Sequence, residues 1–289
     1  MKKLTPTIAA HMLFNFMAVI ALPVFADEDS NMLEADNKNS QSGGYLKLGL
    51  GYRGEVSPYH EERSGASFVV SGRYQWKNGL FIEAPGGANQ LNPGFGFGYN
   101  FYNTEHWSFD VINQLSHGGV EYRARNRDGQ SIDFARDATM STGIRATGAI
   151  DQNTIQFTLL PYAYDSEFDN GLYASLWLAK QWQVKNWSIY SAIGFQYRSK
   201  ELLNYYYGVA KDIAINGTPA YEAGAGVNST IQFGLDYPIT KNWVFESYVR
   251  YTQIASSMSD SPFIYNTRKF DDTRTKNVAE VAILLNYVF

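Results

Sequence analysis

Hydrophobic and polar residues alternate one by one along most of the chain after about residue 43. Between Phe95 and Phe101, for example, four aromatic side chains alternate with Gly and Asn. A period of two indicates β-strands with one apolar and one polar face. We expect twelve strands, most of them near the 9–11 residues that a tilted membrane strand needs, over residues 45–53, 66–76, 79–85, 94–102, 106–115, 139–150, 153–164, 171–183, 186–198, 220–237, 242–254 and 277–289.

The connections between these strands alternate between short and long. The short ones are 77–79, 103–105, 151–153, 184–186 and 238–241, and the long ones are 54–65, 86–93, 116–138, 165–170, 199–219 and 255–276. Short periplasmic turns and long extracellular loops are typical of outer-membrane barrels. The pattern therefore predicts an all-β fold, an antiparallel up-and-down transmembrane β-barrel of about twelve strands, or of ten if 79–85 and the following segment do not span.

Tryptophan recurs beside the predicted short turns. Trp107, Trp187 and Trp243 each restart a strand, and Trp76 ends one. These positions suit the membrane–water interface, where aromatic girdles lie. The alternative is a soluble sandwich whose hairpins carry Trp in the core, although soluble sandwiches rarely keep Trp in register with the turn.

The two ends of the chain carry export and assembly features. Lys2 and Lys3, an apolar stretch over 12–21 and Val24-Phe25-Ala26 predict a signal peptide over residues 1–26, cleaved after Ala26. Residues 27–42 are polar and acidic and predict a flexible periplasmic segment, which leaves residues 43–289 for the barrel. The final strand ends on Tyr287 and Phe289, which resemble the C-terminal signal read by the barrel-assembly machinery. We therefore expect export to the outer membrane of a Gram-negative bacterium.

Composition excludes several classes of function. The formal charge is −4 and no basic tract exists, so we expect no nucleic-acid partner. Cysteine is absent, which excludes disulfides and thiolate sites. No spacing of His or acidic residues predicts a metal site, and we expect no cofactor.

The polar faces of the predicted strands carry balanced charges. Two interpretations are open: a polar pore with an internal field, or a paired network that fills a narrow lumen. Equal numbers of both signs and the inward aromatic residues Trp177, Tyr190 and Tyr248 favour the network. The predicted inward charges are Lys47, Arg53, Arg73, Arg145, Arg198 and Arg250, with Glu83, Asp110, Glu222, Asp236, Glu246 and Glu280.

Catalytic chemistry finds little support in the residues. After the predicted signal, the histidines are His60, His106 and His117, and a hydrolase would need one of them beside a positioned acid or Ser. His60 and His117 lie in predicted outer loops with acidic residues nearby, which are usually solvated. The loop 116–138 balances Arg against acidic residues, so it either binds lipopolysaccharide phosphates or pairs with itself. We expect no enzyme.

Short motifs in the C-terminal third resemble the MipA/OmpV family, best over 170–289. They are Tyr206-Tyr207-Gly208-Val209, Tyr221-Glu222-Ala223-Gly224-Ala225-Gly226, Tyr237-Pro238-Ile239-Thr240-Lys241-Asn242-Trp243 and Asp260-Ser261-Pro262. The resemblance implies a non-catalytic outer-membrane barrel. It also implies a scaffold for a lytic transglycosylase and a penicillin-binding protein. A passive small-solute channel is the alternative function, and outer-membrane lipid and lipopolysaccharide are the expected surroundings.

Overall fold

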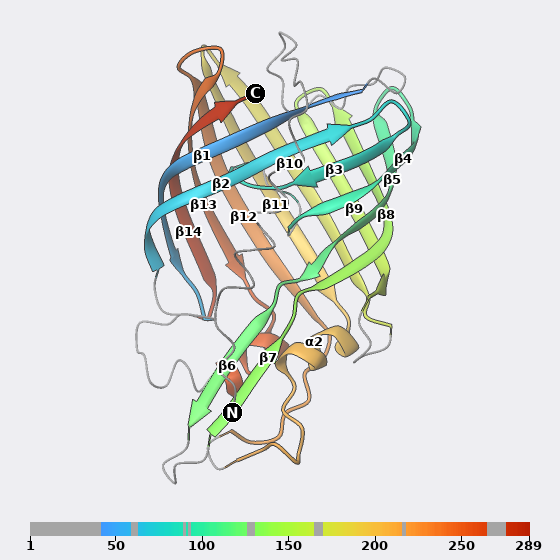
Figure 1. Cartoon of the computed structure of the whole chain (residues 1–289), viewed down its shortest axis with the longest axis vertical. Helices are drawn as coiled ribbons and strands as arrows, with labels where there is room; N and C mark the ends of the chain where they lie inside the picture. Colours follow the sequence, from blue (N-terminus) through green and yellow to red (C-terminus); the bar gives the residue numbers. More distant parts are fainter. Residues whose placement is uncertain are drawn as a thin grey trace, which may run out of the picture.

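The computed structural model describes residues 42–58, 63–88, 91, 94–125, 131–164, 170–215, 218–264 and 276–289. Twelve antiparallel strands form a closed barrel in which each strand pairs with its neighbours along the chain and β1 pairs with β14 (Figure 1). The strands are β1 (Gly43–Val56), β2 (Arg63–Gln75), β3 (Leu80–Ala84), β4 (Gly96–Asn103), β5 (Trp107–His117), β8 (Thr139–Ile150), β9 (Asn153–Ala163), β10 (Tyr173–Val184), β11 (Trp187–Arg198), β12 (Gly226–Pro238), β13 (Trp243–Gln253) and β14 (Val278–Val288).

The barrel confirms the prediction of twelve strands rather than ten. β3 has only five residues, but it pairs with β2 on one side and with β4 on the other. The wall would therefore be open without it. The main difference in bounds is at β12, which begins at Gly226 and not near residue 220.

Alternation sorts the side chains between the two faces of the wall. On β14, Ile283 and Leu285 are 53% and 41% exposed, while Leu284 between them is 1% exposed. The outward side chains form a continuous apolar surface, and the inward ones include most of the charges. Such an apolar surface is expected where the wall meets lipid.

The short turns depend on a few residues with positive φ. Asp151 (φ 51°) and Lys185 (φ 56°) stand in the two-residue turns β8–β9 and β10–β11. Gly79 (φ 88°) closes the β2–β3 turn, where a Cβ atom would lie 2.6 Å from the backbone oxygen of Asn100. Turns of this kind require left-handed backbone or glycine.

The remaining elements gather at the extracellular end of the barrel, opposite the C-terminus (Figure 1). A separate hairpin, β6 (Val120–Arg125) and β7 (Ser131–Arg136), occupies the connection over 116–138 that we predicted as a long loop. The helices α2 (Lys200–Tyr207) and α3 (Ser256–Ser259) follow β11 and β13. Across the described ranges, no helix is both long and apolar enough to cross a bilayer.

Candidate functional site

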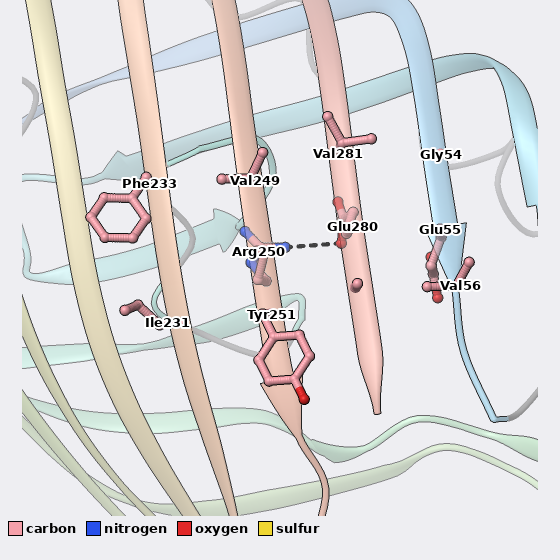
Figure 2. A pocket seen from close by; sticks show the side chains of 11 residues that line it. Gly54, Glu55, Val56, Ile231, Phe233, Val249, Arg250, Tyr251, Glu280 and Val281 are labelled. Carbon is pink, nitrogen blue, oxygen red and sulfur yellow. Dashed lines mark hydrogen bonds and ion pairs between the residues drawn. The ribbon is translucent and has the colours of Figure 1, made fainter. Parts of the chain in front are cut away.

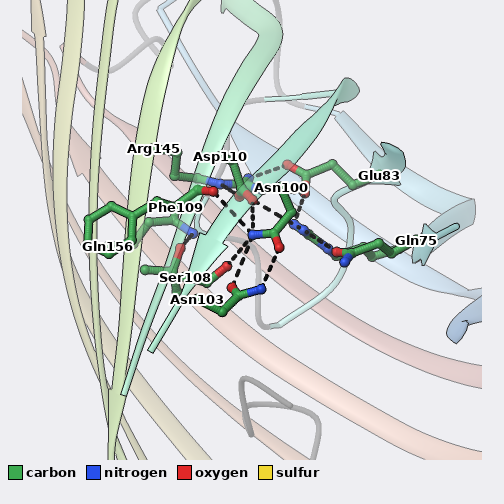
Figure 3. Close-up of polar contacts among 11 residues, drawn as sticks. Gln75, Glu83, Asn100, Asn103, Ser108, Phe109, Asp110, Arg145 and Gln156 are labelled. Atoms are coloured by element: carbon green, nitrogen blue, oxygen red, sulfur yellow. Dashed lines mark hydrogen bonds and ion pairs between the residues drawn. The ribbon is translucent and has the colours of Figure 1, made fainter. Parts of the chain in front are cut away.

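The first of three charged clusters fills the lumen beside β3, β5 and β8. Arg145 is 2% exposed. Figure 3 shows it pointing at two carboxylates, with Nη1 2.6 Å from Glu83 Oε1 and Nη2 2.7 Å from Asp110 Oδ2. Arg73 Nη1 lies 3.0 Å from Glu83 Oε2, and the side-chain amide of Asn100 donates to Asp110 Oδ1 over 2.9 Å. Because an unpaired buried charge is costly, these groups are stable only together.

The second cluster is built around Glu246 of β13. Its Oε2 atom lies 3.1 Å from Lys47 Nζ of β1 and accepts a hydrogen bond from the Asn286 amide over 2.9 Å. Its other oxygen accepts the backbone N–H of Ala88 over 2.6 Å. Asp236 of β12 faces Glu246 in the register of the sheet. Two neighbouring carboxylates therefore lie close to one lysine.

The third cluster is built around Glu280 of β14. Arg53 Nε lies 3.1 Å away and Arg250 Nη1 lies 3.3 Å away, and the Tyr248 hydroxyl donates to Glu280 Oε1. Arg250 also donates to Gln232 Oε1 over 2.8 Å. Each cluster joins residues of several neighbouring strands, so charge pairing links these strands along the lumen side of the wall.

The connection between β3 and β4 turns into the lumen, which the alternation pattern did not predict. Two lumen charges hold its backbone: Glu246 accepts from the Ala88 N–H, and Arg250 Nη2 donates to the Gly87 carbonyl over 3.0 Å. Gly87 has φ 77°, and a Cβ atom there would lie 2.1 Å from Glu246 Oε1. Only glycine fits this approach without a shift.

We call the described residues of this connection (85–88, 91 and 94–95) the inward loop. Its apolar side chains pack on inward-facing residues of the opposite wall. Ala88 packs with Tyr248 of β13, and Leu91 packs with Trp177 and Tyr190 of β10 and β11. All five side chains are at most 8% exposed. The inward aromatic residues therefore narrow the lumen, and the inward loop fills the space that they leave.

A cap covers the extracellular mouth of the barrel. We define it as α2, α3 and the hairpin β6–β7, together with the described residues 208–215, 218–225 and 260–264. Its fully buried apolar core contains Leu202, Leu203, Tyr206, Phe263 and Ile264. Ser199 caps the N-terminus of α2 by accepting the Leu202 N–H, a contact typical of an N-cap. The cap has its own small core and does not lie loosely over the mouth.

Two tyrosines of α2 attach the cap to the strands. The His117 ring stacks on Tyr206 at a centroid distance of 3.7 Å, and its Nε2 atom lies 3.0 Å from the Tyr207 hydroxyl. The Tyr206 hydroxyl lies 2.5 Å from Thr139 Oγ1. The motif Tyr206-Tyr207 carried only a resemblance in the sequence. The structure shows that it joins α2 to the ends of β5 and β8.

The histidines show no arrangement for acid–base chemistry among the described residues. The second nitrogen of His117, Nδ1, lies 2.6 Å from the Gly118 carbonyl, so both ring nitrogens are engaged without an acid. His106 is exposed in a periplasmic turn. His60 lies outside the described residues.

Two of the predicted lumen charges differ from their expected pairing. Arg198 faces the lumen, but its Nε donates to the Ser116 carbonyl over 3.0 Å, and no described carboxylate pairs with it. The expectation that Glu222 faces the lumen is wrong, because β12 begins only at Gly226. Glu222 is instead an exposed residue that pairs with Lys200 of α2, whose hydrogen bond and charge lower its pKa.

The predicted interface aromatics lie beside the short turns. Trp76, Trp187 and Trp243 are exposed and Trp107 is partly exposed. Trp243 packs edge-on against Tyr287 at 5.1 Å, and Tyr287 packs against Phe289 at 4.8 Å. Membrane anchoring by the tryptophans and the assembly signal at the terminus remain predictions. The cleavage after Ala26 falls outside the described residues.

Known proteins resemble this chain over most of its barrel. The model of the family described as MltA-interacting protein MipA matches residues 48–289. Outer membrane protein Omp26La of Vibrio anguillarum is 24% identical over 61% of this chain and 67% of its own length. Outer membrane protein OmpV of Vibrio cholerae serotype O1 is 24% identical over 58% of this chain and 65% of its own length. The chain therefore spans slightly less than two thirds of that relative.

Solved structures of outer-membrane proteins match the chain at low identity and low TM-score. OmpT, an outer membrane protein of Vibrio cholerae, is 10% identical, covers 86% of this chain and 97% of its own, and gives a TM-score of 0.38. A KdgM porin in complex with disordered oligogalacturonate is 10% identical, covers 83% of this chain and 99% of its own, and gives a TM-score of 0.37.

Proposed function

The chain belongs to the MltA-interacting protein MipA family, and from this premise we propose that it is a non-catalytic scaffold in the outer membrane. In this role it holds murein-processing enzymes, a lytic transglycosylase and a penicillin-binding protein, at the inner surface of that membrane. The family's name supports the first partner. The resemblance of the C-terminal motifs supports the pair.

The obstructed lumen is the observation that carries this proposal. Three ion-paired clusters and the inward loop place buried side chains inside the barrel, and the cap lies at its extracellular end. A passive channel needs a continuous water-filled path. A barrel whose interior is filled by side chains gains rigidity instead, which suits a platform for other proteins.

Partners in the periplasm would meet the short turns. Lys77 and Lys241 are exposed on two of these turns. Charged groups at an interface rim mainly set the association rate and the choice of partner. Reversal of both charges tests whether this end of the barrel makes the contact.

The experiment is affinity capture from detergent extracts of the native envelope. Wild-type protein should enrich murein hydrolases or synthases, and Lys77→Glu with Lys241→Glu should reduce that enrichment severalfold. Lys211→Glu, exposed on the extracellular side, is the matched control and should enrich as wild type does. Failure of wild-type protein to enrich either enzyme class, in several detergents, would remove the scaffolding role.

A solute channel is the second candidate, favoured by the way the inward loop is held. Its backbone is fixed by the Ala88 N–H, which donates to Glu246, and by the Gly87 carbonyl, which accepts from Arg250; such bonds contribute only about 1.5–3 kcal/mol each. A solute or partner that displaced the loop would expose a polar wall. Planar-bilayer recordings separate the two functions, since reproducible single-channel steps from wild-type protein would favour the channel.

A further inference from the structure

A groove of about 530 Å³ lies on the outer face of the wall where the first and last strands meet. Its lining comes from two successive outward rows of the sheet. Phe233, Val249, Val281 and Gly54 are in register in one row, and Tyr251 and Ala279 lie in the next. The volume falls within the roughly 300–1,000 Å³ of small-molecule sites.

Small residues give the groove its depth. Gly54 has no side chain and Ala279 only a methyl group, while Phe233, Tyr251 and Val281 around them are about half exposed (Figure 2). A Cβ atom on Gly54 would meet only Val281 Cγ1, at 3.5 Å. The backbone at Gly54 therefore leaves room for a side chain, and the depression exists because glycine does not fill it.

The groove has an apolar floor and a polar extracellular edge. Val56 ends β1 and Val278 begins β14, so this part of the wall lies at the extracellular end of the barrel. At the edge, the Asn277 amide donates to the Tyr251 hydroxyl over 2.7 Å, and the Lys276 Nζ atom, on a side chain that is 65% exposed, lies 3.9 Å from Asp260 Oδ1. Such a site matches an amphipathic molecule with its charged end outward.

The wall behind the groove is rigid. On the lumen side of the same strands, Arg250 of β13 and Arg53 of β1 both pair with Glu280 of β14; Figure 2 shows the pair of Arg250 and Glu280 between the outward side chains. The more buried of these pairs, Arg250 with Glu280, links β13 to β14 directly behind the depression. A fixed concave surface loses little conformational freedom when a ligand binds.

We propose that this groove is a binding site for one acyl chain of an outer-leaflet glycolipid, with the phosphorylated headgroup at the edge formed by Tyr251, Asn277 and Lys276. The wall faces lipid at this height, and lipopolysaccharide forms the outer leaflet of such membranes. The outward side chains of the lining are aliphatic and aromatic, and the charged side chains of Arg250 and Glu280 pair with each other, so the groove suits a hydrocarbon chain. The proposal is independent of the scaffolding role.

The test fills the groove from its floor. Gly54→Leu and Ala279→Leu place a side chain where the acyl chain would lie. Ala174→Leu makes the same exchange as Ala279→Leu on the outer face of β10, away from the groove. Each protein is refolded, checked for the gel shift of a folded barrel, and titrated with lipid A in detergent while native mass spectrometry counts bound lipid. Loss of about two buried methylene contacts predicts a roughly tenfold weaker first binding event. Ala174→Leu should bind as wild type does.

Gly54→Ala is the milder variant, because its methyl group meets only an ordinary contact. It should fold and give an intermediate loss, which keeps the test decisive if the leucine variants do not fold. Equal binding by wild type, Gly54→Leu and Gly54→Ala would overturn the site. Two other outcomes would overturn the glycolipid assignment. In the first, a phospholipid of equal chain length binds the wild-type protein as tightly as lipid A does, and the groove variants weaken its binding to the same extent. In the second, the wild-type protein is a dimer that the groove variants dissociate.

Discussion

Ala88 donates its backbone N–H to the Glu246 carboxylate over 2.6 Å, although 158 positions separate them in the chain. The same carboxylate pairs with Lys47 of β1. One acid on β13 therefore contacts both the inward loop and β1, on the far side of the intervening strand β14. Substitutions near this contact test separately whether the lumen is closed and what stabilises the barrel.

Gly87→Ala should displace the inward loop. The new methyl group would lie 2.1 Å from Glu246 Oε1, and φ at this position is 77°, a region that costs an L-residue about 1–2 kcal/mol. Planar-bilayer recordings should show single-channel steps for Gly87→Ala and none for wild type. Gly65→Ala, where a Cβ atom meets nothing within 4 Å, is the control and should stay silent. A silent Gly87→Ala barrel would show that the loop does not close the path.

Glu246→Ala should lower the free energy of unfolding by about 3–5 kcal/mol, because Lys47 and the Ala88 N–H would lose their partner inside the lumen. Glu246→Gln should cost less, since its side-chain oxygen still accepts from Ala88 and Asp236 remains beside Lys47. Urea unfolding followed by gel shift measures both. Glu222→Gln, at an exposed pair, should be neutral, and equal losses for all three variants would contradict the assignment.

Arg145→Leu should also cost about 3–5 kcal/mol, because Glu83 and Asp110 would keep only Arg73 as a cation. Arg53→Leu removes a cation that is 41% exposed, and solvent screening reduces that loss to about 0–1 kcal/mol. The difference between the two variants is the quantity to measure in urea. Similar losses would mean that burial of the charge does not decide its contribution.

Tyr207→Phe should loosen the cap without unfolding the barrel. It removes the hydrogen bond to His117 Nε2, which is worth about 0.5–1.5 kcal/mol. Limited proteolysis from the extracellular side should cut the cap several times faster, while the gel shift of the barrel stays unchanged. Tyr162→Phe on β9, 69% exposed, should be cut at the wild-type rate. Protection equal to wild type in Tyr207→Phe would remove this contact as an attachment.

Alternation along the chain was enough to predict the wall. Leu284 faces inward and its two neighbours face outward because successive strand residues point to opposite faces. The same rule placed Arg145, Glu83 and Asp110 on the lumen side of their strands. It failed for Glu222, because the alternating pattern continued before Gly226 although the chain there is not yet part of the sheet.

The inward loop and the cap could not be predicted in the same way. Their places depend on contacts between residues far apart in the sequence, such as Ala88 with Glu246 and Tyr207 with His117. A period of two describes a strand but carries no information on where a connection goes. Pro85-Gly86-Gly87-Ala88 is the one local signal, since such small residues permit a close backbone approach.

The two cations of β1 also have a consequence for the assembly of the barrel. Lys47 and Arg53 lie on β1, but their partners Glu246 and Glu280 lie on β13 and β14, the last two strands of the barrel to be synthesised. An incomplete chain would present both cations to the lumen without these acids, and its inward loop would lack the Glu246 anchor. The charges of β1 are therefore neutralised only when the C-terminal strands are complete. A truncated chain should insert into the membrane less efficiently than the full chain and should be degraded faster by periplasmic proteases.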